Sequence, residues 1–347
     1  MFSLVDSTYC TNDKIIVGLV VCRIKDFLNR LGSLVKYLNT KALILALFSV
    51  TIWGSSFASI SASLQGGYTA GHLILVRFLI ASIIFFIIAL WPGVQFRLPH
   101  KEDLFKIVIL GLIGISVYHL CVTFGQLSIS AGTAGMLIGS APIFTTIIAI
   151  IVLKERLGRI GWFGLAFGFV GILMIALGTG GGSLGISPGV FLVIMAAFST
   201  AIFFVYQKPL YKKYTAIELT AYFTWVGTIP FLFFAPGLLE GIQHATLEAN
   251  ISAVYIGIFP TAIAYLTWAM ALSYSEASSV SNSLYLEPVV AIIVTWIWLQ
   301  ELPSALSIGG GFVAIASVIL VNMYGKKHQL KLSPQASPPT YDKIDIL

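Results

Sequence analysis

The stretch that decides the fold is LYLEPVVAIIVTWIWLQE, residues 284–301. It is almost wholly apolar, yet it contains Glu287 and, next to it, Pro288. A run of this kind is typical of a membrane-spanning helix, because about 20 apolar residues cross roughly 30 Å of hydrocarbon. A charged carboxylate at the centre of such a helix costs about 2.5–3.5 kcal/mol or more. We therefore expect the Glu287 side chain to face protein or a water-filled space instead of lipid.

The rest of the chain has the same character. Of its 347 residues, 58% are hydrophobic and only 10% are charged, whereas soluble domains carry about 25% charged residues. The apolar runs are continuous and do not alternate, which favours helices over the strands of a barrel. We predict an all-α membrane protein with ten transmembrane helices, near residues 42–62, 72–91, 105–125, 133–153, 160–177, 187–206, 217–235, 252–272, 279–299 and 305–323.

The Lys and Arg residues indicate how these helices are oriented. Nineteen of the 20 precede the first helix, follow the last one or lie in alternate connections, so that all nineteen share one side of the membrane. Basic segments stay in the cytoplasm. We therefore expect both termini there, in a plasma membrane (the inner membrane, if the source is a Gram-negative bacterium). The net charge of +6 then reflects topology, and we expect no nucleic-acid partner.

The two ends of the chain lie outside the predicted helices. Residues 1–41 form a cytoplasmic extension, in which IKDFLNRLGSLVKYL (24–38) has the apolar spacing of an amphipathic helix on the membrane surface. A solvated extension is the alternative. Residues 324–347 are polar and contain Pro and Ser, so we expect a disordered cytoplasmic tail. The three cysteines form no recognisable framework, and the sequence predicts no metal site and no cofactor.

The chain repeats itself. A shift of 146 residues places Pro142 on Pro288, and the predicted helix starts and turns keep the same offset. The two units are residues 42–177 and 187–323. Each has five helices, an odd number, so the second unit must enter the membrane from the opposite side. Inverted repeats are typical of secondary transporters, in which two halves expose a central site alternately to each face.

Several motifs carry a family resemblance. They are WGSSF (53–57), VRFLIA (76–81), SISAGTAGMLIGSAPIFTTIIAIIVLKERLG (128–158), TAIAYLTWAMAL (261–272) and YSEASSVSNSLYLEPVVAIIVTWIWLQELP (274–303). Together they resemble the EamA-type drug/metabolite transporter superfamily. The resemblance implies ten helices in two repeats, a central cavity, and transport of small metabolites such as amino acids, their derivatives or drug-like compounds. The sixth helix, AAFSTAIFFVYQK (196–208), departs from the family by lacking a tryptophan.

Polar residues inside the apolar runs are the candidate site. Glu287 and His119 are candidates for substrate binding or proton coupling, since a histidine has an ordinary pKa of about 6.5. His119 aligns with Tyr265 across the repeats, so both are expected to face the central axis. Weaker lining candidates are Tyr118, Gln126, Trp268 and Tyr285.

Arg77 is the one basic residue away from the cytoplasmic side. It either extends to the outer surface, pairs with a ligand anion or a glutamate, or has a structural role. Pro142 and Pro288 predict a bend at the same place in each repeat. The small-residue patterns GMLIG (135–139) and GLAFG (164–168) predict helix packing surfaces.

Two classes of function are compatible with these features. The leading one is a secondary transporter with a small-molecule substrate and a lipid surround, because no phosphate-binding loop indicates ATP as the driver. The alternative is an integral membrane enzyme acting on lipid-like substrates. Such an enzyme displays clustered His, Asp or Ser at the interface, whereas the five histidines here are scattered. We therefore predict no catalytic residues. A homodimer stays an open alternative.

Overall fold

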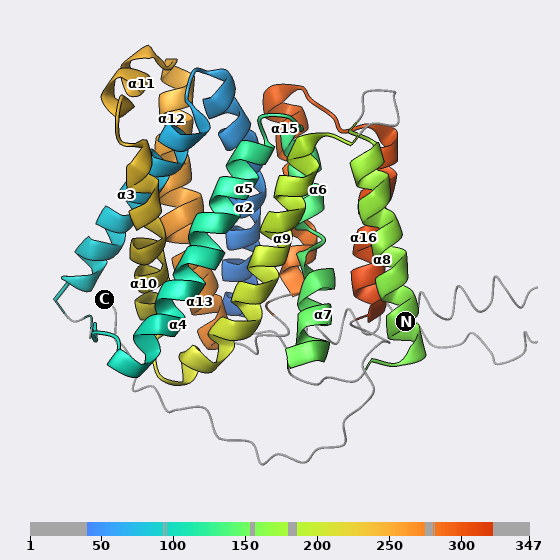
Figure 1. The fold of residues 1–347 in the computed structure, drawn as a ribbon, viewed down its shortest axis with the longest axis horizontal. Helices are drawn as coiled ribbons and strands as arrows, with labels where there is room; N and C mark the ends of the chain where they lie inside the picture. The colour runs from blue at the N-terminus through green and yellow to red at the C-terminus, as the bar shows by residue number, and fades with distance from the viewer. Residues whose placement is uncertain are drawn as a thin grey trace, which may run out of the picture.

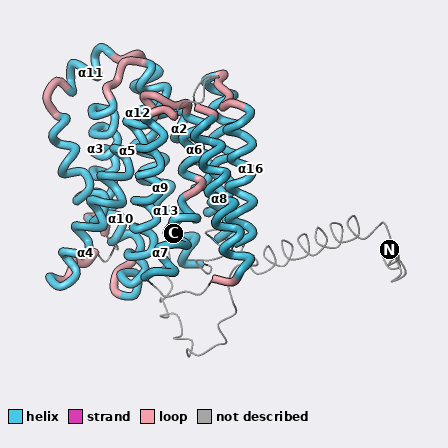
Figure 2. The backbone as a smooth tube through the Cα atoms, turned by 45° about the vertical axis from the view of Figure 1, so that its right-hand side comes forward, coloured by secondary structure: helices cyan, strands magenta, loops and turns pink. Residues whose placement is uncertain are grey.

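The computed structural model describes residues 40–321, except 93, 95, 153–156, 180–185, 275–279 and 281. The expected amphipathic helix of residues 24–38 and the expected tail of 324–347 lie outside the described residues. Within this part of the chain, eight helices are long and apolar enough to cross a membrane, and two shorter apolar helices follow them. The protein is an all-α membrane protein whose helices stand side by side in one bundle (Figure 1; Figure 2).

Ten helical segments fill the ten predicted positions. Those of the first repeat are α2 (Thr40–Gln65), α3 (Ala70–Ala89), α4 (Lys101–Gly111) continued by η1 (Leu112–Val117) and α5 (Tyr118–Gly125), α6 (Ala131–Ile138) followed by α7 (Ala141–Val152), and α8 (Arg159–Leu177). Those of the second repeat are α9 (Pro188–Gln207) with η2 (Lys208–Lys212), α10 (Ala216–Thr228) with η3 (Ile229–Phe234), α12 (Leu247–Ile256) continued by η4 (Gly257–Ile263) and α13 (Ala264–Tyr274), η5 (Asn282–Leu286) with α15 (Glu287–Leu299), and α16 (Ala305–Leu320). A short helix that the sequence did not predict, α11 (Leu238–His244), lies between η3 and α12.

The duplication is visible in where the helices begin. Five starts in the second repeat lie 146 residues after their counterparts: Ala70 and Ala216, Lys101 and Leu247, Tyr118 and Ala264, Ala141 and Glu287, and Arg159 and Ala305. Local signals explain the agreement, because Thr69 and Thr215 cap α3 and α10 with the same side-chain hydrogen bond. Each repeat also contains a π-helical segment, and the two, η1 and η4, lie at nearly matching positions.

The contacts between the two repeats are symmetric: a contact between two helices has a counterpart between their equivalents in the opposite repeats. The first helix, α2, packs against α13 and α15, and its counterpart α9 packs against α5 and α7. Likewise, α3 packs against η4, and α10 packs against η1. The last helices of the two repeats, α8 and α16, lie side by side (Figure 2). This pattern of exchange confirms the predicted architecture of two inverted five-helix repeats.

Glycines bring α8 and α16 into backbone contact. A Cβ atom on Gly171 would lie 2.8 Å from the carbonyl oxygen of Gly310, and one on Gly310 would lie 2.6 Å from the carbonyl oxygen of Gly171. Further along, Gly164 faces Val321, where a Cβ would come within 2.7 Å of a methyl group. Small residues allow helices to approach closely in lipid, so GLAFG (164–168) lies in a packing surface.

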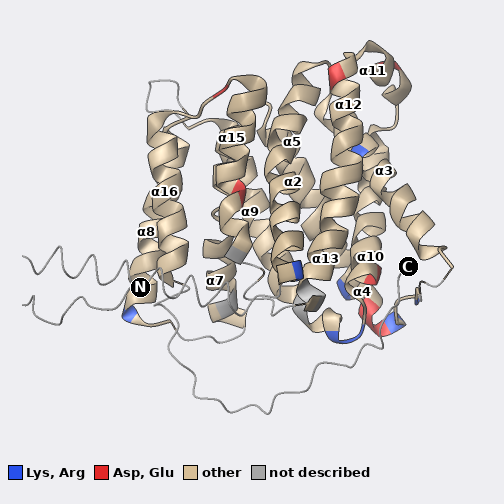
Figure 3. Cartoon of the chain, turned by 180° about the vertical axis from the view of Figure 1, so that it is seen from behind, with Lys and Arg blue, Asp and Glu red and all other residues tan. Residues whose placement is uncertain are grey.

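Most of the described Lys and Arg residues gather at one end of the bundle, which we call the basic end (Figure 3). At each end of the bundle, a tyrosine at a matching position in the duplication donates a side-chain hydrogen bond to another helix. At the basic end, Asp103 Oδ2 accepts hydrogen bonds from the Tyr214 hydroxyl at 3.1 Å and from Lys213 Nζ at 2.8 Å. At the opposite end, the Tyr68 hydroxyl donates to Asn250 Oδ1 at 2.7 Å. Tyr68 and Tyr214 are again 146 residues apart.

Candidate functional site

Two residues of opposite charge and two tyrosines lie on neighbouring helical segments inside the bundle. Arg77 comes from α3, Tyr118 from α5, Tyr265 from α13 and Glu287 from α15, so both repeats contribute. Contacts of their neighbours connect them, since Trp53 packs against the ring of Tyr265 at 5.4 Å, and a Cβ on the adjacent Gly54 would lie 3.1 Å from the carbonyl oxygen of Glu287. With Thr261, which holds Arg77, these four residues form what we call the central cluster. Tyr118, Tyr265 and Glu287 keep part of their surface accessible.

Arg77 is held in place inside the protein. It is only 5% exposed, and its Nε–H donates to the hydroxyl of Thr261 at 2.6 Å. Thr261 in turn donates to the carbonyl of Ile256 at 2.8 Å, so its hydroxyl is fully oriented. The expectation that Arg77 extends to the outer surface is therefore wrong, because the side chain turns inward to a neighbouring helix. Its remaining N–H groups make no hydrogen bond within the described part of the chain.

The π-helical segments shape the surroundings of this cluster. A π-turn releases a carbonyl from the helical pattern, and such turns occur frequently at functional sites. Trp53 Nε1 donates to the carbonyl of Pro260 in η4 at 3.0 Å, and the Ser199 hydroxyl donates to the carbonyl of Ile113 in η1 at 2.5 Å. Trp53 and Ser199 are separated by 146 residues. Ser199 therefore stands opposite Trp53 in the duplication and makes a similar hydrogen bond, to a carbonyl one residue away from the matching position.

Glu287 differs from its predicted setting. The sequence suggested a position about eight residues into a continuous helix, but Glu287 is the first residue of α15, directly after the 3-10 turn η5. Pro288 then lies in the first turn of α15, where its missing N–H leaves no helical bond unmade. In the first repeat, α6 ends at Ile138 and α7 starts at Ala141, just before Pro142. At both prolines, the structure thus has the start of a new helix in place of the bend that the sequence predicts. Among the described residues, no ion pair joins Glu287 to a basic side chain.

His119 lies beside the central cluster but is shut off from solvent. It is 2% exposed, with ring centroids of Phe78 and Tyr118 each 4.6 Å away in edge-to-face geometry. Neither ring nitrogen has a hydrogen-bond partner in the described part of the molecule. Although it aligns with Tyr265 in the duplication, the two residues differ in access, because Tyr265 is partly exposed.

An aromatic group covers one side of the cluster. The ring of Trp53 lies 5.4 Å from that of Tyr265 and 5.1 Å from that of Trp268. The sequence analysis named Tyr265 and Trp268 as lining candidates, but it included Trp53 only as part of the WGSSF motif (53–57). Its signal was its position in a motif that carries the family resemblance.

The two remaining candidates are Gln126 and Tyr285. Gln126 follows α5 near the end opposite the basic one, where its Oε1 accepts from the Ser61 hydroxyl at 3.3 Å, and it is buried. Tyr285 lies in η5, two residues before Glu287, is partly exposed and packs against the main apolar core.

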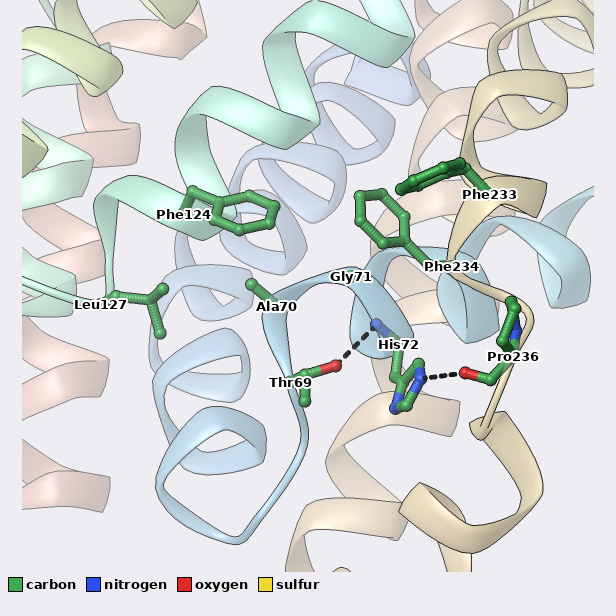
Figure 4. A pocket seen from close by; sticks show the side chains of 9 residues that line it. All are labelled: Thr69, Ala70, Gly71, His72, Phe124, Leu127, Phe233, Phe234 and Pro236. Carbon is green, nitrogen blue, oxygen red and sulfur yellow. Dashed lines mark hydrogen bonds between the residues drawn. The ribbon is translucent and has the colours of Figure 1, made fainter.

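A separate pocket lies between the start of α3 and the end of η3 (Figure 4). It has a volume of about 440 Å³ and is lined by Thr69, Ala70, Gly71, His72, Phe124, Leu127, Phe233, Phe234 and Pro236. Figure 4 shows the His72 ring, whose Nε2 donates to the carbonyl of Pro236 at 3.1 Å, beside a largely apolar wall. None of the predicted site residues lines this pocket. Arg77 lies five residues after His72 on the same helix, roughly 7 Å further along its axis.

Comparison with known proteins decides the family. Residues 40–177 and 187–323 each match the model of the EamA-like transporter family. The chain belongs to this family. The EamA-like transporter is 39% identical to the uncharacterized transporter YdfC of Bacillus subtilis, with 78% of this chain and 87% of that protein covered.

Two further relatives have names that mention amino acids. One is a probable terminal-alkyne amino-acid exporter of Streptantibioticus cattleyicolor, 35% identical over 82% of this chain and 94% of the relative. The other is a probable amino-acid metabolite efflux pump of Salmonella typhimurium, 26% identical over 81% of this chain and 94% of the relative. The EamA-like transporter described here is accordingly a membrane transporter of small metabolites and not an enzyme.

Proposed function

We propose that this EamA-like transporter moves amino acids or amino-acid derivatives across the plasma membrane by alternating access, with the central cluster as its substrate site. The observation that carries this proposal is the cluster itself. Arg77, Tyr118, Tyr265 and Glu287 come from four different helical segments of both repeats, and inside the bundle α3, α13 and α15 pack against α2, while α5 packs against α3. The names of the two relatives that mention amino acids support the substrate class.

Alternating access requires the two repeats to move relative to each other around this site. The π-helical segments η1 and η4 interrupt equivalent helices, α4–α5 and α12–α13, next to the central cluster. They are therefore the natural places for those helices to bend. We take the basic end as the cytoplasmic end, following the distribution of Lys and Arg (Figure 3).

Glu287 is the better candidate for proton coupling. A proton carrier must exchange protons with water during the cycle. Glu287 is partly exposed, whereas His119 is 2% exposed and enclosed by aromatic rings. A helix-embedded carboxyl in a membrane protein is a recurring element of proton relays.

Purified protein reconstituted in liposomes tests this function. The vesicles are loaded with each of the 20 common amino acids in turn, and uptake of the same labelled amino acid is followed with and without a pH gradient. We expect counterflow for at least one of them above empty liposomes. Uptake equal to that of empty liposomes for the whole panel would refute the proposed substrate class.

A further inference from the structure

We propose that two buried carboxylates at the basic end, those of Asp103 and Glu218, form a gate that holds this end shut more firmly than neutral groups hold the opposite end. In the absence of substrate, we therefore expect the opposite end to open more often than the basic end. This inference rests on the alternating access proposed above, and it adds which end of the transporter is closed at rest.

Asp103 joins the two repeats at the basic end. It lies in the first turn of α4 and is 2% exposed. Its carboxylate accepts hydrogen bonds from Lys213 Nζ at 2.8 and 3.0 Å and from the Tyr214 hydroxyl at 3.1 Å. The Tyr214 hydroxyl in turn accepts a bond from the backbone N–H of His100 at 2.8 Å. Because Lys213 and Tyr214 belong to the second repeat, any separation of the repeats at this point must break all of these bonds.

Glu218 holds the connection between α3 and α4 against α10. It is 3% exposed, and its Oε2 accepts from the N–H of Thr215, the residue that caps α10. Its Oε1 accepts from the N–H of Arg97 at 2.9 Å. Next to this bond, the ring of Phe96 packs edge-to-face against that of Tyr222, with the centroids 5.3 Å apart. The connection is thus fastened to the second repeat by a charge-assisted hydrogen bond and an aromatic contact.

The opposite end has the same arrangement with neutral groups. Tyr68, which is opposite Tyr214 in the duplication, donates to Oδ1 of Asn250 at 2.7 Å. Thr246 donates its backbone N–H to the carbonyl of Gly66 at 2.9 Å. Both bonds join the two repeats, as the bonds of the basic end do, but neither involves a charged group.

The duplication shows that the charges belong to the basic end alone. The residues opposite Asp103, Lys213 and Glu218 carry no carboxylate or ammonium group; in that order, they are Ala249, Gly67 and His72. As far as the structure describes the opposite end, the hydrogen bond between the repeats that does involve a charge, from Gln65 to Glu301, is exposed and so contributes little. Charge-assisted hydrogen bonds are roughly twice as strong as neutral ones. The basic end is therefore the more firmly closed one.

Distances across the two ends of the full-length protein test this gate. In a variant whose three natural cysteines are replaced by alanine, spin labels are attached to new cysteines. These replace Lys101 and Lys212 at the basic end, or Leu127 and Leu247 at the opposite end, all of which are exposed. Double electron–electron resonance in lipid nanodiscs without substrate then measures the fraction of molecules with a long distance at each end. We expect this open fraction to be at least about fivefold larger at the opposite end.

Variants of the gate should change one end at a time. Asp103→Asn and Lys213→Gln remove the same ion pair from its two sides, and Glu218→Gln removes the other charge. Each should raise the open fraction at the basic end at least about fivefold. Tyr68→Phe should raise it at the opposite end instead. Glu102→Gln, which removes an exposed carboxylate beside Asp103 in the same turn, is the matched control and should leave both ends as in the wild type.

Lys213→Gln protects the test against misfolding, because the Lys213 side chain is 51% exposed. Equal open fractions at the two ends of the wild type would overturn the gate. So would a basic end that Asp103→Asn and Lys213→Gln open no more than Glu102→Gln does, or an absence of opening at both ends in every variant. With counterflow observed, each of these results leaves amino-acid transport standing. Expected distances together with no counterflow for any amino acid would refute the substrate class and leave the gate standing.

Discussion

Replacing Gly171 by Ala would place a methyl group between α8 and α16 at a point where the two backbones touch. The new Cβ would lie 2.7 Å from the amide nitrogen of Ala314, 2.8 Å from the carbonyl oxygen of Gly310 and 3.1 Å from the Cα of Ala314. Ordinary contact begins at 3.4 Å, so the helices must separate by about 0.7 Å, the difference between 3.4 and 2.7 Å. All three neighbours are backbone atoms, and no side-chain rotation can relieve the overlap.

The magnitude follows from two opposing effects. Overpacking a well-packed interface costs about 1–3 kcal/mol, while Ala in place of Gly within a helix contributes roughly 0.5–1 kcal/mol of stability. We expect Gly171→Ala to destabilise the protein by about 1–2 kcal/mol net. Gly309→Ala, on the facing helix, is the matched control. There the Cβ would meet only Met174 Cε at 3.5 Å, so the helical preference dominates and stability should stay equal or rise by up to about 1 kcal/mol.

The assay is thermal unfolding of both variants and the wild type in one detergent, followed by the loss of the monodisperse peak on size-exclusion chromatography. The expected order of melting temperature is Gly309→Ala at or above wild type, and Gly171→Ala below it. If Gly171→Ala melts at or above Gly309→Ala, then α8 and α16 do not pack backbone to backbone, and our reasoning about this interface is wrong.

Three further outcomes are expected. Trp53→Phe removes the hydrogen bond to Pro260 and should lower stability by about 0.5–1.5 kcal/mol in the same thermal assay. Trp298→Phe, which removes an exposed hydrogen bond to Glu248, should lower stability less. An equal loss of stability in both variants would contradict the role of Trp53 at η4. The hydrogen bond from Lys213 to Asp103 raises the pKa of Lys213 above its ordinary value of 10.5, so this interaction stabilises the protein below that pH and is lost as the pH rises through the folded pKa. The melting temperature of Asp103→Asn should therefore lie below that of wild type by a constant amount between about pH 6 and 9, and this difference should shrink only above about pH 10.5. A difference that disappears near neutral pH would refute this. In counterflow under a pH gradient, Glu287→Gln should lose the response to the gradient, and His119→Ala should keep it. The cavity left by His119→Ala should lower the stability by roughly 2–5 kcal/mol. The reverse pattern of responses would make His119 the proton carrier.

The helix starts could be predicted because their signals are local and occur twice. A capping threonine precedes both α3 and α10, and five helix starts of the second repeat lie 146 residues after their counterparts. The π-helical segments η1 and η4 could not be predicted in the same way. Their released carbonyls are satisfied by Trp53 and Ser199, which lie on helices of the opposite repeat, and such long-range partners leave no trace in a local pattern.

In the candidate site, too, some residues could be predicted from the sequence and others could not. Arg77 and Glu287 stood out as charges within apolar runs, and the structure places Arg77 on α3, with its side chain on Thr261, and Glu287 at the start of α15. The anchor on Thr261 was missed, because a threonine in an apolar helix gives no signal of its own. His119 looked equally promising from its residue type, yet Phe78 and Tyr118 enclose it, and enclosure depends on packing between helices that are distant in sequence.

Trp53 and Ser199 hold twin π-turns with side chains of very different size. If the two halves of the chain were identical, rotation about the molecular two-fold axis would convert the inward-facing arrangement into the outward-facing one, and both would have the same free energy. Each mismatch between twin residues removes that degeneracy. Under the proposed alternating access, the resting orientation of this transporter in the absence of any gradient would therefore depend on the many positions at which its two halves differ.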